Sequence, residues 1–296
     1  MGTPPSPSPS PSRRIVGLVA AFFLVVLVIV GVAAWQRIAP ALGWTSPVVD
    51  TVPPALPAGL ERAPLAILEF SKTSGFRHRE AIPAARASLE AIAKRKGWAL
   101  FSTENAAVFN DEQLSHFDVV FGNNITGDNW TAEQKAAFTR WIEAGGGFVG
   151  VHGAAGTRYR YWDWYTDVLL GGGRFVGHPM GPQFREARVS VVAPEHPTVS
   201  HYGDSFLHTD EWYSFEASPR EAGSFVLATL DESTYDPGDD LSMGDDHPII
   251  WIACPGRGRS FYSALGHPAA TYQKAAHARM LEAALAWAGE RGSRCP

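Results

Sequence analysis

Short apolar runs alternate with segments of helical periodicity along the middle of the chain. Leu65–Phe70, Trp98–Ser102 and Asp118–Gly122 are apolar or aromatic runs that predict buried strands. Ala81–Lys96, which Gly97 ends, and Thr131–Ala144 repeat their apolar residues at helical spacing and predict amphipathic helices. Strands that alternate with helices indicate βαβ units, so we predict a doubly wound, mainly parallel α/β sheet with helices on both faces.

The stretch 145–156 is the centre of this pattern. Phe148–Val151 is an apolar run bounded by glycines, which predicts a buried central strand that ends in a tight turn. His152 is at the tip of that turn. Open α/β sheets bind ligands at the carboxyl ends of their strands, so His152 is the first candidate for a functional residue.

Two common interpretations of a glycine-rich turn do not apply here. Gly145, Gly147 and Gly150 match the dinucleotide-binding spacing, but they precede or lie within the strand instead of following it. The turn contains neither Ser nor Cys, so it offers no nucleophile for acyl transfer.

The last third of the chain predicts an added antiparallel portion from about Arg185 onward. Its pattern changes to alternating strands, a hairpin across 255–258 and a final helix. The predicted elements are strands at 186–192 and 224–230, hairpin strands at 249–254 and 259–265, and a helix at about 272–288.

The amino-terminal segment predicts a membrane anchor. Residues 1–14 form a Pro/Ser-rich tail expected to be disordered, and Ile15–Trp35 is a run of 21 residues without a charge, long enough to span a bilayer. Arg13 and Arg14 precede it, which predicts a single-pass topology with a cytoplasmic amino terminus and an extracytoplasmic domain. A cleaved signal peptide is the alternative, because Val32–Ala34 resembles a weak cleavage site.

Composition indicates how the rest of the chain is divided and which partners are excluded. The Pro-rich stretch 36–63 predicts a spacer, followed by a domain at 64–290, and the 45% apolar residues of the whole chain are enough to supply a core. The net charge of −5 without a basic stripe argues against nucleic-acid binding. Whether Cys254 and Cys295 pair, and whether the chain forms oligomers, stays open at this stage.

Histidines supply most of the candidate chemistry. Imidazole titrates near neutral pH and is the commonest metal ligand, although a single histidine is more often a hydrogen-bonded structural residue. With Asp210 and Glu211, these histidines could form an acid–base or metal site. No pair has zinc-finger spacing, so no cofactor is predicted; a divalent metal stays open, with its ligands expected from different loops. Six histidines lie at strand ends or in Gly/Pro loops: His78, His152, His178, His208, His247 and His267.

Aromatic side chains offer a second kind of candidate site. Four of the six residues from 159 to 164 are aromatic, more than one helix face can bury, so some could stack on a saccharide while others pack in the core. Arg77 and His78 lie in the polar loop after the first predicted strand. The candidate substrate-binding residues are Arg77, His78, Tyr159, Tyr161, Trp162 and Trp212.

A series of ordered motifs resembles the ThuA-like (trehalose utilisation) domains, which belong to the class I glutamine amidotransferase-like superfamily. The resemblance covers about Leu65–Gly289. Its motifs are Thr73-Ser74-Gly75-Phe76-Arg77-His78, the stretch 145–154, Trp164-Tyr165, Gly172-Gly173-Arg174-Phe175, Gly177-His178-Pro179, Asp210-Glu211-Trp212-Tyr213, Leu227–Glu232, Thr234-Tyr235, His247–Trp251 and Gly266-His267.

This resemblance implies a flavodoxin-like fold and a role in the use of trehalose-type disaccharides, including 3-keto sugars, in bacteria. The superfamily carries a catalytic Cys at the elbow, whereas this chain has His152 there, which argues against glutamine amidotransferase activity. We expect a carbohydrate-active hydrolase, lyase or isomerase; the alternative is a non-catalytic saccharide-binding or sensing module. The candidate catalytic residues are His152, His178, Glu211, His208 and His267.

Overall fold

The chain forms two compact units, Met1–Thr45 and Ser46–Pro296. The computed structural model describes residues 11–41, 49–157, 161–290 and 295. In the first unit, helix α1 (Pro11–Ala41) contains the expected span and carries Arg13, Arg14 and Arg37 near its ends. Within the described ranges, no helix is both long enough and apolar enough to cross a membrane. The transmembrane helix expected at 15–35 is therefore not supported.

The second unit is built on a nine-stranded sheet of order β2-β1-β3-β4-β11-β10-β9-β6-β7. The first five strands in this order pair in parallel, and the other pairs are antiparallel. The order 2-1-3-4 is that of flavodoxin-like folds, as expected. The strands are β1 (Ala66–Phe70), β2 (Ala99–Thr103), β3 (Val119–Asn123), β4 (Gly147–Val151), β6 (Arg185–Val191), β7 (Ser205–Asp210), β9 (Phe225–Asp231), β10 (His247–Ala253) and β11 (Arg259–Ser263).

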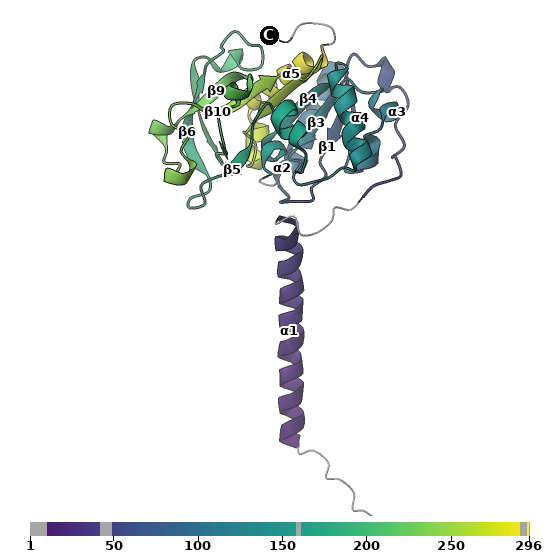
Figure 1. Ribbon diagram of the computed structural model, residues 1–296, viewed down its shortest axis with the longest axis vertical. Coiled ribbons are helices and arrows are strands. Elements are labelled where there is room, and N and C mark those ends of the chain that lie inside the picture. Colours follow the sequence, from purple (N-terminus) through teal and green to yellow (C-terminus); the bar gives the residue numbers. More distant parts are fainter. Residues whose placement is uncertain (1–10, 42–48, 158–160, 291–294, 296) are drawn as a thin grey trace, which may run out of the picture. The chain divides into compact units, whose positions relative to one another are not determined.

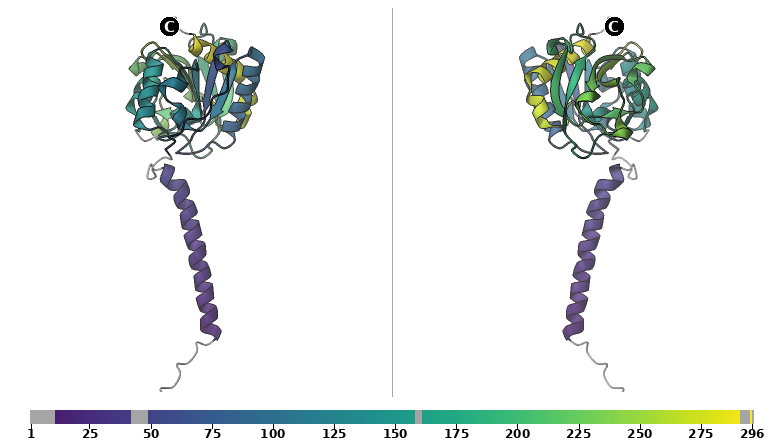
Figure 2. Two further views of the ribbon diagram at one scale, coloured as in Figure 1. Left: turned by 90° about the vertical axis from the view of Figure 1, so that its right-hand side faces the viewer. Right: turned by 90° about the vertical axis from the view of Figure 1, so that its left-hand side faces the viewer.

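Helices cover both faces of the parallel part of this sheet (Figures 1 and 2). Helices α2 (Ala81–Lys96) and α5 (Ala275–Gly289) contact each other, and α5 contacts β3, β4 and β11. Helices α3 (Asp111–Leu114) and α4 (Ala132–Glu143) contact each other on the opposite face. Every residue of β1, β3 and β4 is buried, because helices cover the sheet on both sides, and most of these residues are apolar. The polar exceptions Glu69 and Asn123 hydrogen-bond to each other.

Local sequence explains where α4 begins and how it packs. Thr131 and Gln134 form a reciprocal capping box at its amino end. The Phe138 ring packs edge to face on Phe148 of β4, with ring centroids 6.1 Å apart. This contact fixes the helix against the strand that leads to His152.

The antiparallel portion begins at β6, as expected, and the predicted hairpin of β10 and β11 is confirmed. In this hairpin, β11 also pairs in parallel with β4, so one strand joins the two parts of the sheet. A separate small sheet pairs β5 (Phe175–Gly177) with β8 (Ser214–Phe215). The aromatic segment forms a π-helix at Tyr165–Leu169, a form that often occurs at functional sites.

Part of the expected Pro-rich spacer belongs to the domain. The Gln134 side-chain amide donates to the Asp50 carbonyl oxygen, and the Asp50 carboxylate forms an ion pair with Lys72. Leu60 is buried. The domain therefore begins before residue 64, because these contacts bind the segment to β1 and α4. Cys254 and Cys295, whose pairing the sequence left open, form a disulfide.

Candidate functional site

His152 follows β4 directly and has an unusual backbone conformation. Its φ is 41°, and Asn124, directly after the neighbouring β3, has a φ of 51°. Side chains other than glycine rarely occupy this left-handed region, and such residues gather at functional sites. The Tyr262 hydroxyl donates to the His152 carbonyl oxygen at 2.9 Å, and the His152 side chain has no exposed surface. The turn at His152 is thus buried, and the backbone that carries its imidazole is held in place.

Three histidines and one glutamate from four loops meet at this turn, and we call them the His–Glu cluster. His78 follows β1, His152 follows β4, Glu211 follows β7 and His267 follows β11. One potential metal-ligand atom of each lies within 4.8 Å of those of the other three. Strands β1, β4 and β11 run in parallel, so their carboxyl ends lie at one edge of the sheet, where open α/β folds bind ligands.

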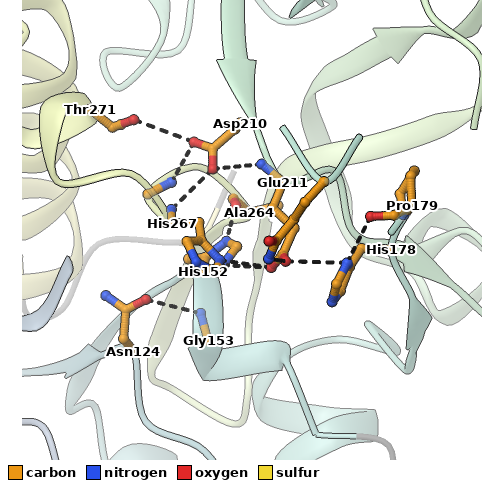
Figure 3. A network of polar contacts seen from close by, with 12 residues as sticks. Asn124, His152, Gly153, His178, Pro179, Asp210, Glu211, Ala264, His267 and Thr271 are labelled. Carbon is orange, nitrogen blue, oxygen red and sulfur yellow. Dashed lines mark hydrogen bonds and ion pairs between the residues drawn. The ribbon is translucent and has the colours of Figure 1, made fainter. Parts of the chain in front are cut away.

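Figure 3 shows three of the cluster residues, His152, Glu211 and His267, side by side. His152 Nε2 lies 3.2 Å from His267 Nδ1 and 3.3 Å from Glu211 Oε2. Glu211 Oε2 lies 2.9 Å from His267 Nδ1. These three atoms form a nearly equilateral triangle inside the protein.

The two carboxylate oxygens of Glu211 have different surroundings. Oε2 faces His152 and His267, whereas Oε1 accepts a hydrogen bond from the Gln183 amide and lies 3.2 Å from His178 Nδ1. Burial favours the neutral acid, but the neighbouring imidazoles of His152 and His267 outweigh it and hold the pKa of Glu211 well below its usual range. The carboxylate is therefore charged at neutral pH.

Asp210 supports the cluster from the adjacent position. Its carboxylate accepts the backbone N–H groups of Gly266 and His267 at 2.8 and 3.0 Å, and that of Glu211 at 2.9 Å. Burial raises its pKa, but the hydrogen bond from His208 contributes to a net lowering. Asp210 thereby holds the loop of His267 close to Glu211.

His78 completes the cluster as a buried imidazole. It is 4% exposed, and its Nδ1 contacts no hydrogen-bonding partner among the described residues. Burial and the neighbouring His152 and His267 lower the pKa of His78 to about 2, so its ring is neutral at physiological pH. The ring centroid lies 4.8 Å from that of His152 and 4.7 Å from that of His267.

A second set of polar side chains, buried except for Lys274, lies on the other side of Asp210, and we call it the His208 group: His208, Asp210, Thr271, Lys274 and His277. His208 Nε2 lies 3.2 Å from Asp210 Oδ2, and Lys274 Nζ lies 3.1 Å from His208 Nδ1. His277 is buried, and both of its ring nitrogens contact no polar partner in the described part of the chain.

The structure brings some of the predicted site residues together and separates others. His78, His152, Glu211 and His267 form the cluster, with His178 on the outer oxygen of Glu211. His208 and His247 hydrogen-bond elsewhere, His247 with Glu232 and the Tyr213 carbonyl oxygen. Arg77 is paired with Glu104. Trp212 has no exposed surface and donates to the Arg185 carbonyl oxygen, so the expected sugar-stacking role of this ring is wrong.

The expected aromatic platform lies along a separate pocket. Tyr161 and Trp162 line it with Trp130 and Tyr165, beside Ala154 and Ala155 of the turn that follows His152. Trp162 is half-buried and stacks on Trp164 with centroids 5.3 Å apart. Tyr159 lies outside the described residues. None of the four cluster residues lines this pocket.

Sequence reasoning missed Asn124 and Gln183. Asn124 could have been found, because it follows β3 as His152 follows β4, and its Oδ1 lies 3.4 Å from the Gly153 backbone nitrogen. Gln183 has no sequence signal, because only the fold brings its amide to Glu211.

The sheet order and the buried cluster define a class: a flavodoxin-like α/β protein with a polar site at the carboxyl ends of its strands. The sequence matches the family described as ThuA, trehalose utilisation, over residues 66–288. This chain belongs to that family. The part of the chain matched contains the whole His–Glu cluster.

Solved structures agree with this assignment. A ThuA-like protein from Bacteroides uniformis is 26% identical with a TM-score of 0.65, covering 79% of this chain and 95% of that chain. A ThuA-like protein from Parabacteroides merdae is 19% identical with a TM-score of 0.57, covering 78% of this chain and 92% of that chain, and shares the fold. No curated protein matches this sequence.

Proposed function

We propose that this protein is an enzyme of trehalose-type disaccharide use that acts on a saccharide or keto-sugar at the His–Glu cluster. One observation carries the proposal: His78, His152, Glu211 and His267 converge from four loops at the ligand-binding edge of an α/β sheet. Burying four ionisable side chains together costs free energy of folding. Such a cluster therefore points to a functional site. Membership in the trehalose utilisation family supports the substrate class.

The proposed chemistry is proton transfer. Glu211 is ionised. An imidazole that accepts a proton from a C–H or O–H group of the sugar can pass that proton on at neutral pH. A keto group acidifies the neighbouring C–H bond, so a keto-sugar is the substrate on which such a base acts most effectively. The half-buried side of the cluster, where His267 and His178 are 17% and 22% exposed, is the side from which a sugar would approach.

The test is turnover by the full chain on trehalose and on its 3-keto derivative, followed by mass spectrometry of the products. We expect conversion of the keto-sugar and loss of conversion in His267→Gln, which retains hydrogen bonding but cannot carry a proton at neutral pH. His116→Gln, at an exposed histidine, is the matched control. Saccharide binding without conversion by the wild type would contradict the enzyme and leave a binding module.

A further inference from the structure

We propose that His78, His152, Glu211 and His267 bind one first-row divalent transition-metal ion. This deepens the proposed function by naming a cofactor class for the same site, but it is tested by metal binding alone. The four side chains come from different loops, so no spacing motif in the sequence marks them as a ligand set.

The distances fit a coordination sphere. In an ion with bonds of about 2.1 Å, neighbouring ligand atoms are about 3.0 Å apart in octahedral geometry and about 3.4 Å apart in tetrahedral geometry. The triangle of His152 Nε2, His267 Nδ1 and Glu211 Oε2 has edges of 3.2, 3.3 and 2.9 Å. Two imidazoles and one carboxylate on one face are a known arrangement for transition metals that keep positions open for a substrate.

Hydrogen-bond accounting points in the same direction. His152 Nδ1 lies 2.8 Å from the Ala264 carbonyl oxygen, which only accepts, so Nδ1 carries the proton of a neutral ring. The lone pair of Nε2 then faces Glu211 Oε2 at 3.3 Å, and two acceptors repel each other unless a positive charge lies between them. A metal ion supplies that charge. Doubly protonated His152 is the alternative: it would pair with the Glu211 carboxylate, but it would also place a cation in a fully buried position beside two other imidazoles.

The groups around the cluster resemble the outer partners of metal ligands. Such partners fix the tautomer of a ligating histidine and the orientation of a ligating carboxylate. The Ala264 carbonyl oxygen does so for His152, and the Gln183 amide holds the outer oxygen of Glu211. Oε2 of Glu211 is left for the ion.

The donor set also selects the kind of metal. Calcium and magnesium prefer oxygen ligands throughout, whereas imidazole suits Zn²⁺, Fe²⁺, Ni²⁺ and related ions. Three imidazoles and one carboxylate therefore favour a transition metal. If the ion is six-coordinate, two positions remain for oxygen atoms of a sugar.

The experiment titrates the full chain, purified without a His tag and stripped with a chelator, with Zn²⁺, Mn²⁺, Co²⁺ and Ni²⁺ in a calorimeter. We expect one ion per chain. His267→Gln and Glu211→Gln should each weaken binding by more than about 100-fold, since even outer partners cost about 10- to 100-fold. Gln183→Leu should lie in that smaller range, and His116→Gln should bind like the wild type.

Circular dichroism checks the fold of each variant, and His267→Gln, in a partly exposed loop, keeps the test valid if Glu211→Gln fails to fold. Wild-type dissociation constants weaker than about 1 mM for all four ions would overturn the proposal, as would equal binding by His267→Gln. Metal binding without turnover would leave this site intact and contradict the proposed function alone.

Discussion

The His–Glu cluster and the His208 group contain the same kinds of side chain in different relationships. In the His208 group each contact of His208 joins a donor to an acceptor, because Nε2 meets the Asp210 carboxylate and Nδ1 meets the Lys274 ammonium; the ring nitrogens of His277 contact no described polar partner. In the cluster, a lone pair of His152 faces a carboxylate oxygen, and Nδ1 of His78 contacts no described partner. Contacts that join donors to acceptors stabilise the fold, whereas acceptors that face each other mark a place for a positively charged ligand.

The largest expected effect is the loss of turnover when a residue of the His–Glu cluster is replaced. Glu211→Gln keeps the size of the side chain but removes its charge, so turnover should fall by roughly 10³-fold, in the range that acid–base groups contribute. Steady-state kinetics on the keto-sugar measure this. Unchanged turnover in a folded Glu211→Gln protein would place the chemistry elsewhere and remove the distinction between the two groups.

The second effect separates stability from activity. His208→Leu leaves the buried Asp210 carboxylate without its imidazole partner, so the free energy of unfolding should fall by about 3 kcal/mol. Urea denaturation measures it, with the exposed His116→Leu as the control. Turnover per folded molecule should remain within about tenfold of the wild type. A loss as large as that of Glu211→Gln would show that His208 acts in the reaction.

A third effect concerns pH. Burial lowers the pKa of His277 to about 3, so this ring stays neutral in the folded chain while it is protonated below about 6.5 in the unfolded chain. As pH falls from about 6.5 to 3, the unfolded state binds the extra proton and stability is lost at up to about 1.4 kcal/mol per pH unit.

His277→Leu removes this contribution and the unpaired ring nitrogens. The variant should be more stable at pH 7 by about 1 kcal/mol and lose less stability in acid. Thermal melts at pH 7, 6, 5 and 4 compare it with the wild type. Parallel pH curves for the two proteins would mean that His277 is not a buried neutral ring.

The smallest effect tests the aromatic pocket. Trp162→Ala should raise KM for the sugar about three- to tenfold with kcat nearly unchanged, since one stacked ring contributes about 0.5 to 1.5 kcal/mol. Trp98→Ala, at a ring that lines neither described pocket, is the control. Equal KM values for the two variants would separate this pocket from sugar binding.

Much of the sheet could be predicted from sequence, because buried parallel strands and amphipathic helices have strong periodic patterns. The helix predicted at 81–96 has the bounds of α2, and the strand predicted at 118–122 is shifted by one residue from β3. The sequence could not predict that β11 would lie beside β4, since pairing depends on the packing of segments far apart in the chain.

The site was predictable by position, and the grouping of its side chains was predictable only in part. The rule that ligands bind after strands found His78, His152 and His267 among six candidates. Which histidines meet depends on the face to which each side chain points. His208 and Asp210 are two apart in β7 and share a face, whereas Glu211 points the other way, so neighbours in sequence belong to different groups. The sequence does not say which face lies over the site.

The pairing of β4 with β11 also has a consequence for biosynthesis. His267 is 115 residues from His152, so the ribosome releases β1 to β4 well before the strand that completes the site. Until then β4 presents an unpaired edge, the kind of surface on which nascent chains aggregate or recruit chaperones. Closing so long a loop is slow, and a chain stopped before β11 holds three of the four cluster residues but lacks His267. Ligand binding at this site therefore reports a fully folded chain, and a partly folded one is inert.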